Sequence, residues 1–174
     1  MKDVPPVRAV AHGGRQVRTA PEFGSIYDHF SVVYDFPNGA KGFLFCRQQD
    51  MCSNDNSDTI MGTKGIARIL GFTSGPVITG EKNWKFEGNR GNMYQTEHNE
   101  LFASIRAGKA MNDGDWMTQS TMMAILGRMA AYTGKSITWE EALNSQENIF
   151  PAKLDWKEPI AVPPVPMPGK TKFI

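Results

Sequence analysis

The sequence has little of what several large classes of protein require. Its 19 basic and 18 acidic residues leave a net charge of +1, with no run of lysine or arginine, so the basic surface that binds nucleic acid is not expected. No apolar run is long enough to cross a bilayer, and residues 1–6 hold no signal-peptide segment. We therefore expect no nucleic-acid partner, no membrane partner and a cytoplasmic location, unless an export signal precedes residue 1.

Cysteine is also scarce. Cys46 and Cys52 stand six positions apart, and the sequence has neither a C-x-x-C motif nor a histidine pair at metal-ligand spacing. Two cysteines do not make a disulfide framework, so we expect two free thiols; a disulfide that closes the intervening loop is the alternative. No metal site is expected.

What the sequence does contain is typical of a soluble globular domain. Apolar residues make up 40% and charged residues 21% of its 174 positions, enough for one domain with a real core. Prolines at 159, 163, 164, 166 and 168 mark the last segment as extended. We predict one domain over residues 1–157 and an extended tail over 158–174.

The first half of the chain alternates in the manner of β-strands. Residues 28–36 and 40–48 flank Asn38 and Gly39, a strong hairpin signal whose midpoint pairs His29 with Gln48. Strands over 6–12, 59–62, 66–70, 77–79 and 84–86 bring the number before residue 88 to six or seven, connected as an antiparallel meander. One side of the strand 28–36 is apolar and the other is mixed: Phe30, Val32, Tyr34 and Phe36 against His29, Ser31, Val33 and Asp35.

The second half has the 3.6-residue period of helices. One buried stripe is expected on a helix that ends at Gly108, a second helix is expected to end at Gly134, and a third begins with a capping box of Thr138 and Glu141. The positions expected to be buried in the first two helices are Tyr94, His98, Leu101, Phe102 and Ile105, then Met122, Ile125, Leu126, Met129 and Ala130. The predicted class is α+β: an open-faced, mostly antiparallel sheet of about six strands with helices packed on one face.

Several local motifs occur together in a fixed order. They are Gly-Gly-Arg-Gln at 13–16, Tyr-Asp-His-Phe at 27–30, Gly-Thr-Lys-Gly at 62–65, Tyr-Gln-Thr-Glu-His at 94–98, Ile-Arg-Ala-Gly at 105–108, Ala-Ile-Leu-Gly-Arg-Met at 124–129, Ile-Thr-Trp-Glu-Glu-Ala-Leu at 137–143 and Pro-Met-Pro-Gly-Lys-Thr-Lys-Phe at 166–173. Together they resemble the C-terminal half of the Gfo/Idh/MocA oxidoreductases, NAD(P)-dependent enzymes that act mostly on sugars and polyols. The resemblance implies an open sheet whose exposed face supports a homo-oligomer and lines the substrate site.

The cofactor-binding features of that family are not found in this sequence. No glycine group reads G-x-G-x-x-G, the turn that brings backbone amides to a pyrophosphate. The family's Glu-Lys-Pro motif is matched only in its first two residues by Glu81-Lys82-Asn83, which we interpret as a solvated turn. The family's Asp-x-x-x-His motif is absent from the sequence. We expect no catalytic residue and no bound NAD(P) in this chain, although the resemblance implies NAD(P) for the full-length family. The isolated chain is predicted to be inactive, and a separate Rossmann domain is a possible partner.

Six side chains are predicted to contact a sugar-like small molecule: Tyr27, His29, Arg47, Gln48, Tyr94 and His98. Arginine and glutamine at strand ends donate hydrogen bonds to hydroxyls, and the hairpin pairing places His29 near that end. The alternatives are that Arg47 covers the sheet edge or pairs with Asp28, and that His98 is a core histidine that is hydrogen-bonded and neutral.

Three functions fit the sequence. The favoured one is the substrate-binding and oligomerisation domain of an NAD(P)-dependent sugar or polyol oxidoreductase. The alternatives are a stand-alone carbohydrate-binding or scaffolding module that has lost catalysis, and an enzyme of another type that uses His29 or His98 as a base. The sequence does not identify the sugar.

Overall fold

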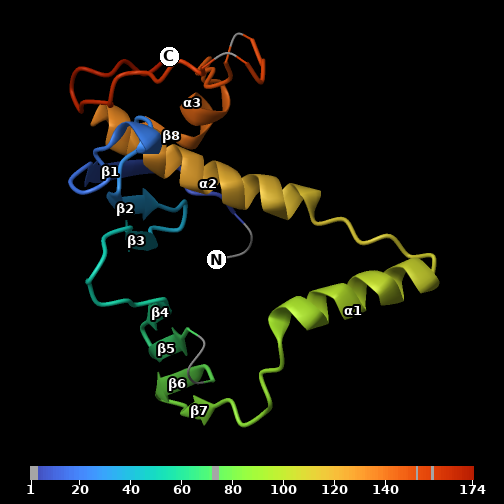
Figure 1. Ribbon diagram of the computed structural model, residues 1–174. Coiled ribbons are helices and arrows are strands. Elements are labelled where there is room, and N and C mark those ends of the chain that lie inside the picture. The colour runs from blue at the N-terminus through green and yellow to red at the C-terminus, as the bar shows by residue number, and fades with distance from the viewer. Residues whose placement is uncertain (1–3, 72–74, 152, 158) are drawn as a thin grey trace. The chain divides into compact units, whose positions relative to one another are not determined.

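The computed structural model describes residues 4–71, 75–151, 153–157 and 159–174. Residues 1–3 of the N-terminal segment and Glu158, the first residue of the predicted tail, lie outside this description. The chain divides into two compact units (Figure 1). Unit 1 comprises the residues up to Asp50 and those from Asp113 on, and unit 2 comprises Met51–Asn112.

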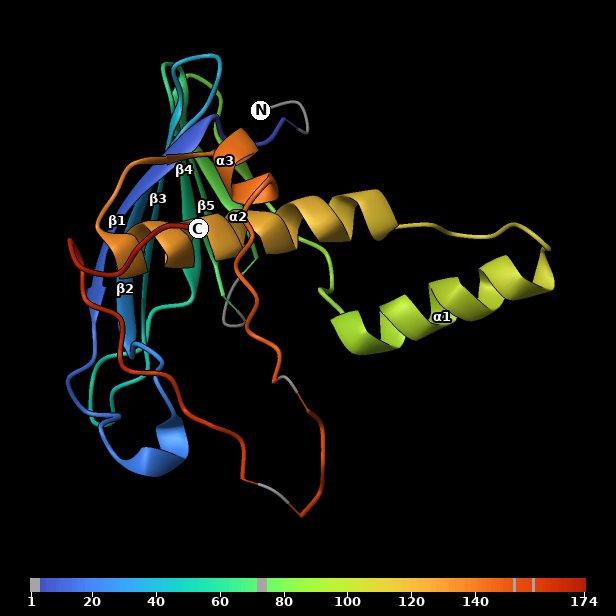
Figure 2. The same ribbon diagram turned by 90° about the horizontal axis from the view of Figure 1, so that it is seen from above.

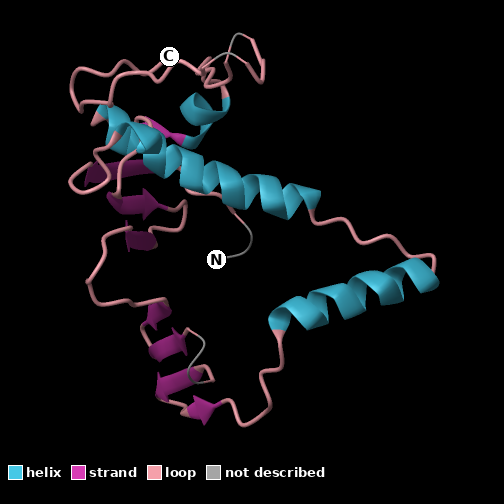
Figure 3. Ribbon diagram, in the orientation of Figure 1, coloured by secondary structure: helices cyan, strands magenta, loops and turns pink. Residues whose placement is uncertain are grey.

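Unit 1 is built on a four-stranded antiparallel sheet in the order β3-β2-β1-β8 (Figure 3). Its strands are β1 (Arg8–Gly14), β2 (His29–Asp35), β3 (Lys41–Arg47) and β8 (Ile137–Thr138). A short 3-10 helix, Pro21–Phe23, lies in the connection between β1 and β2. The predicted hairpin of β2 and β3 is confirmed, whereas β8 was not expected from the sequence.

The predicted register of that hairpin is wrong by one residue. His29 pairs with Arg47, not with Gln48. The connection is a three-residue loop, Pro37–Gly39: the amide of Gly39 donates to the carbonyl of Phe36, and Gly39 has a φ of 80°. A glycine in the left-handed region adds one residue to the turn, which shifts the pairing relative to a two-residue Asn-Gly turn.

The two faces of this sheet differ as the alternation predicts. The covered face lies under helix α2 (Gly114–Thr133) and forms the core of unit 1 (Figure 2). Its residues include Ala9, Val32 and Tyr34, packed against Leu126 and Met129. We call the opposite side the open face. It carries Arg8, Val10, His12, His29, Ser31, Val33, Asp35, Lys41, Phe43, Phe45 and Arg47.

A close contact joins α2 to the covered face. The hydroxyl of Tyr34 donates to the carbonyl oxygen of Met123 at 3.0 Å. Beside it Gly127 is so near the sheet that an added Cβ would lie 2.6 Å from the Tyr34 hydroxyl oxygen and 3.2 Å from Val32. A glycine at this position therefore lets the helix approach the strand.

The residues after α2 complete unit 1. Helix α3 (Trp139–Leu143) begins with the predicted capping box, since Thr138 and Glu141 exchange side-chain and backbone hydrogen bonds. Gly134, with a φ of 70°, ends α2 as predicted. The tail then lies along α2: the amide of Gly169 donates to the carbonyl of Thr133, and Phe173 packs against the core.

Unit 2 contains a second antiparallel sheet in the order β4-β5-β6-β7. Its elements are β4 (Ser57–Gly62), β5 (Gly65–Leu70), β6 (Val77–Gly80), β7 (Trp84–Lys85) and helix α1 (Met93–Arg106). The two predicted strand pairs of this region are confirmed. The α+β class and the antiparallel pairing are confirmed too, with the strands divided between two sheets of four.

The ends of α1 follow the sequence, but its burial does not. The amide of Gly108 donates to the carbonyl of Ile105, and that of Lys109 to Ser104, an arrangement in which Gly108 ends the helix with a φ of 62°. The predicted buried stripe is wrong: Tyr94 and Ile105 are each 62% exposed, and Leu101 and Phe102 about half exposed. An amphipathic pattern indicates that a helix can bury one side, not which surface buries it.

Within the described ranges, no helix is long and apolar enough to span a membrane.

Candidate functional site

Asp28 lies at the point where the ends of β1, β2 and β3 meet, and its side chain is fully buried. One carboxylate oxygen, Oδ2, accepts hydrogen bonds from the backbone amides of Gln16, Val17 and Arg18 at 2.7, 2.7 and 3.0 Å. Burial alone would raise the pKa of this carboxyl, but these amides and His29 hold the pKa far below its usual value. Asp28 is therefore ionised at neutral pH.

His29 is the first residue of β2 and stands on the open face. Its Nδ1 lies 2.7 Å from Oδ1 of Asp28. The ring passes over Gly14, where an added Cβ would lie 3.1 to 3.2 Å from the ring atoms Cε1 and Nε2. The side chain is 40% exposed, so a molecule on the open face can reach the imidazole.

Arg47 lies directly opposite His29 at the end of β3. Residues directly opposite in an antiparallel pair point to the same face, so the guanidinium and the imidazole share the open face. Gln48 takes another role: its backbone amide donates to the carbonyl of Asp28 at 2.8 Å, and its Oε1 accepts from Arg18 at 3.4 Å. The structure thus brings His29 and Arg47 together and ties Gln48 to the loop that surrounds Asp28.

Tyr27 lies on the other side of this site. It is 6% exposed, and its ring meets that of Tyr132 in α2 edge to face at 4.6 Å between centroids. Its hydroxyl donates to the carbonyl of Pro166 in the tail at 2.8 Å. Burial, with a smaller effect of Tyr132, raises the pKa of Tyr27. The structure shows this side chain as an anchor for the tail rather than as part of the open face.

Tyr94 and His98 belong to unit 2. They stand one turn apart on α1, and Nδ1 of His98 lies 2.7 Å from the carbonyl oxygen of Tyr94. His98 is exposed, so the alternative of a core histidine does not hold. Whether these two side chains join His29 and Arg47 stays a prediction.

The sequence interpretation missed the loop of residues 15–18. Arg15 anchors it by donating to the carbonyls of Gly24 and Ala20 at 2.5 and 3.0 Å. The loop then directs three successive amides at Asp28. The available signal was the polar run Gly-Gly-Arg-Gln, together with an aspartate placed immediately before a histidine.

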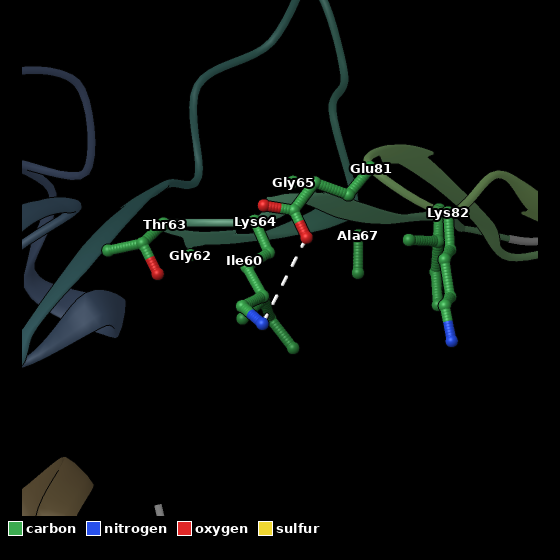
Figure 4. Close-up of a pocket in the computed structure, with 9 residues that line it drawn as sticks. Ile60, Gly62, Thr63, Lys64, Gly65, Ala67, Glu81 and Lys82 are labelled. Atoms are coloured by element: carbon green, nitrogen blue, oxygen red, sulfur yellow. Dashed lines mark ion pairs between the residues drawn. The ribbon is translucent and has the colours of Figure 1, made fainter.

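Unit 2 has a hollow of about 550 Å³ over its sheet (Figure 4). Its floor is apolar, formed by Ile60, Ala67 and Ile78, which are paired across β4, β5 and β6. Lys64 and Glu81 stand on its rim, 3.9 Å apart and mostly exposed. The amide of Glu81 donates to the carbonyl of Lys64, an arrangement that agrees with the interpretation of residues 81–83 as a solvated turn.

No protein-family model matches this sequence, and no curated protein is matched by it. The fold, however, is similar to that of solved oxidoreductases. An aldose-aldose oxidoreductase from Caulobacter crescentus, solved with glycerol, has a TM-score of 0.60 and 20% identity, over 78% of this chain and 42% of that one. An oxidoreductase from Agrobacterium radiobacter, solved with NAD+, L-tartaric acid and magnesium, has a TM-score of 0.56 and 13% identity, over 78% and 44%.

The WlbA dehydrogenase from Bordetella pertussis, solved with NADH and UDP-GlcNAcA, has a TM-score of 0.55 and 18% identity, over 77% of this chain and 39% of that one. At these identities the similarity is one of fold. This chain spans about two fifths of the length of each of these proteins. Its fold is therefore similar to that of a part of each of these oxidoreductases.

Proposed function

We propose that this chain is the substrate-binding and oligomerisation part of an NAD(P)-dependent oxidoreductase of the Gfo/Idh/MocA type, acting on a sugar or polyol. The observation that carries the proposal is the fold similarity, which covers more than three quarters of this chain and a limited part of each oxidoreductase. The ordered motifs from residues 13 to 173 support the same family.

The described residues do not fit a dinucleotide. A pyrophosphate needs free amides at the start of a helix, after a glycine-rich turn. At the start of α1 the side chain of Asn92 already accepts from the amides of Tyr94 and Gln95. The first turn of α2 carries Asp115, whose carboxylate would repel an anion. We therefore assign NAD(P) to another part of the enzyme and expect the isolated chain to be inactive.

The end of the open face near His29 and Arg47 supplies the sugar contacts. An imidazole nitrogen and a guanidinium recognise hydroxyl and carbonyl or carboxylate oxygens, and their positions are held by paired strands rather than by a mobile loop. Without a nucleotide domain to enclose the ligand, we expect weak binding, roughly millimolar.

Chemical-shift mapping of the isotope-labelled chain, with monosaccharides and their keto and acid derivatives, tests this assignment. We expect shifts at His29 and Arg47 that His29→Ala and Arg47→Ala abolish. Asp35→Ala, at the other end of β2, is the control and leaves them in place. Shifts that cluster elsewhere, or that survive both substitutions, contradict the site. Accompanying shifts at Tyr94 and His98 would add α1 to it.

A further inference from the structure

The contacts of His29 determine which of its ring nitrogens carries the proton. Asp28 is buried and holds one oxygen against three backbone amides, so its other oxygen, Oδ1, has a fixed position. That oxygen lies 2.7 Å from Nδ1 of His29. A carboxylate can only accept a hydrogen bond, so the proton of the neutral imidazole resides on Nδ1. The other nitrogen, Nε2, then carries a lone pair.

We propose that Asp28 is a positioning residue that holds His29 in the Nδ1–H tautomer, so that Nε2 accepts a hydrogen bond from a ligand hydroxyl on the open face. This inference rests on the proposed function and deepens it, because it assigns the hydrogen-bond direction at the site. The ligand must present a donor at His29, as a sugar or polyol hydroxyl does and as a carboxylate does not.

Arg47 supplies hydrogen-bond donors beside the acceptor nitrogen of His29. It is opposite His29 on the same face and offers only donors. A ligand that fits both side chains presents a hydroxyl to His29 and an acceptor oxygen to Arg47. Adjacent hydroxyl and carbonyl or carboxylate groups, as in a hydroxy-ketose or an aldonic acid, meet this requirement. A carboxylate accepts a charge-assisted hydrogen bond from the guanidinium, which is stronger than one accepted by a hydroxyl, so the site favours a sugar acid over a sugar that carries hydroxyls alone.

The groups that face His29 come from three elements. Asp28 precedes β2, Arg47 ends β3, and His12 on β1 is one pair further along the same face. Arg18 lies nearby, with its guanidinium bound to Gln48. A proton added at Nε2 would turn the acceptor into a donor and place it beside Arg47.

The first test reads the tautomer without any ligand. Nitrogen-15 chemical shifts of the His29 ring, recorded on the full chain at alkaline pH, should show a protonated Nδ1 and a bare Nε2. In Asp28→Asn the side-chain amide can donate to Nδ1, and the tautomer should reverse, as occurs when the buried aspartate of a serine-protease triad is replaced by asparagine. Asp35→Asn removes a carboxylate from the same strand and should leave the His29 shifts unchanged. A wild-type ring protonated at Nε2 overturns the proposal, even if Asp28→Asn fails to fold.

The second test uses D-gluconate and D-glucose as probes in calorimetric or chemical-shift titrations. We expect D-gluconate to bind more tightly than D-glucose, and Asp28→Asn to weaken D-gluconate binding by roughly tenfold, the size of one lost hydrogen bond in a polar site. Asp35→Asn should bind as the wild type does. If the wild type binds gluconate at His29 and Asp28→Asn binds it equally well, the positioning role is wrong while the proposed function stands. If neither probe binds while the ring has the expected tautomer, the proposed function fails at this site.

Discussion

Asp28 joins three stretches of the chain that are distant in sequence. Its carboxylate accepts hydrogen bonds from the amides of residues 16–18 and from Nδ1 of His29. Its backbone amide donates to the carbonyl of Gly14, and its backbone carbonyl accepts from the amide of Gln48. Shortening the side chain would leave the amides of residues 16–18 and Nδ1 of His29 without their carboxylate acceptor. One aspartate thus stabilises the fold and orients the candidate site.

We predict that the stability due to Asp28 depends on pH. Because its pKa in the folded chain lies below the value of about 3.9 in the unfolded chain, its contribution is fully present above that value and is lost as the pH falls. Asp28→Asn should lower the free energy of unfolding by about 2 kcal/mol at neutral pH. The difference in the free energy of unfolding between Asp28→Asn and the wild type should shrink by about 1.4 kcal/mol for each pH unit below the unfolded pKa.

Urea denaturation of both proteins at several pH values measures this. The exposed Asp50→Asn serves as the control for the loss of one negative charge and should differ little from the wild type at neutral pH. A deficit of Asp28→Asn that stays constant down to the lowest pH would contradict the prediction.

At the scale of elements, the hairpin and α2 show how small local features place larger ones. The three-residue loop with Gly39 in a left-handed conformation sets which strand residues share a face. Gly127 then allows α2 to lie against Val32 and Tyr34. Helix, loop and strand patterns indicated that these elements exist, but neither glycine could be assigned its role without the packed structure.

We predict that Gly127→Ala destabilises unit 1. Alanine favours a helix by about 1 kcal/mol over glycine. Its methyl group, however, would lie 2.6 Å from the Tyr34 hydroxyl, which is held by Met123, and overpacking of this kind costs about 1 to 3 kcal/mol. The net effect should be a loss of about 1 kcal/mol in the free energy of unfolding, measured by thermal or urea denaturation.

A double-substitution cycle isolates the cause. In a Tyr34→Phe background the hydroxyl is gone, so Gly127→Ala should cost less than it does alone. Ala124→Gly, on an exposed position of the same helix, reports the helix preference by itself. If Gly127→Ala raises stability in the Tyr34 protein, the close approach is not a constraint.

At the scale of the whole molecule, the open face of unit 1 exposes several large apolar side chains. Phe43 is 65% and Phe45 is 74% exposed, and Val10 beside them is 43% exposed. In the observed register Phe43 and Phe45, and not Leu44, share this face with Val33. Such a continuous apolar surface indicates an interface.

We predict a symmetric dimer in which the open faces of two chains pack together, the simplest closed arrangement for one self-complementary surface. Light scattering at micromolar concentration should report the dimer, and Phe45→Lys should convert it to a monomer by placing a charge in the interface. Phe150→Lys is the matched control, since Phe150 is 78% exposed elsewhere on unit 1. A wild-type protein that remains monomeric at these concentrations contradicts the prediction.

We also predict that the isolated chain does not bind NAD(H) or NADP(H). The amides at the start of α1 are capped by Asn92, and Asp115 occupies the first turn of α2. Isothermal calorimetry and nicotinamide fluorescence should show no saturable signal. Micromolar binding by either method would be inconsistent with the assignment of the cofactor to another part of the enzyme.

Sequence alone determined the features that depend on neighbours along the chain. Alternation in 28–36 separated the covered face from the open face, because successive strand residues point to opposite sides. Gly108 and Gly134 marked helix ends, and Thr138 with Glu141 marked a helix start, since caps satisfy backbone groups within a few residues. The observed fold is similar to that of solved oxidoreductases, the class of enzyme that the motifs from 13 to 173 indicated.

Only the tertiary structure decided what depends on distant residues. The Asn-Gly signal located the hairpin, but the shape of its loop placed Arg47, not Gln48, opposite His29. The pattern of α1 showed an apolar stripe, yet its exposure depends on a surface that the pattern does not describe. The carboxylate of Asp28 is held by amides ten to twelve residues earlier in the chain, and the hydroxyl of Tyr27 donates to a carbonyl 139 residues later. Such contacts follow from three-dimensional packing, which local propensity does not encode.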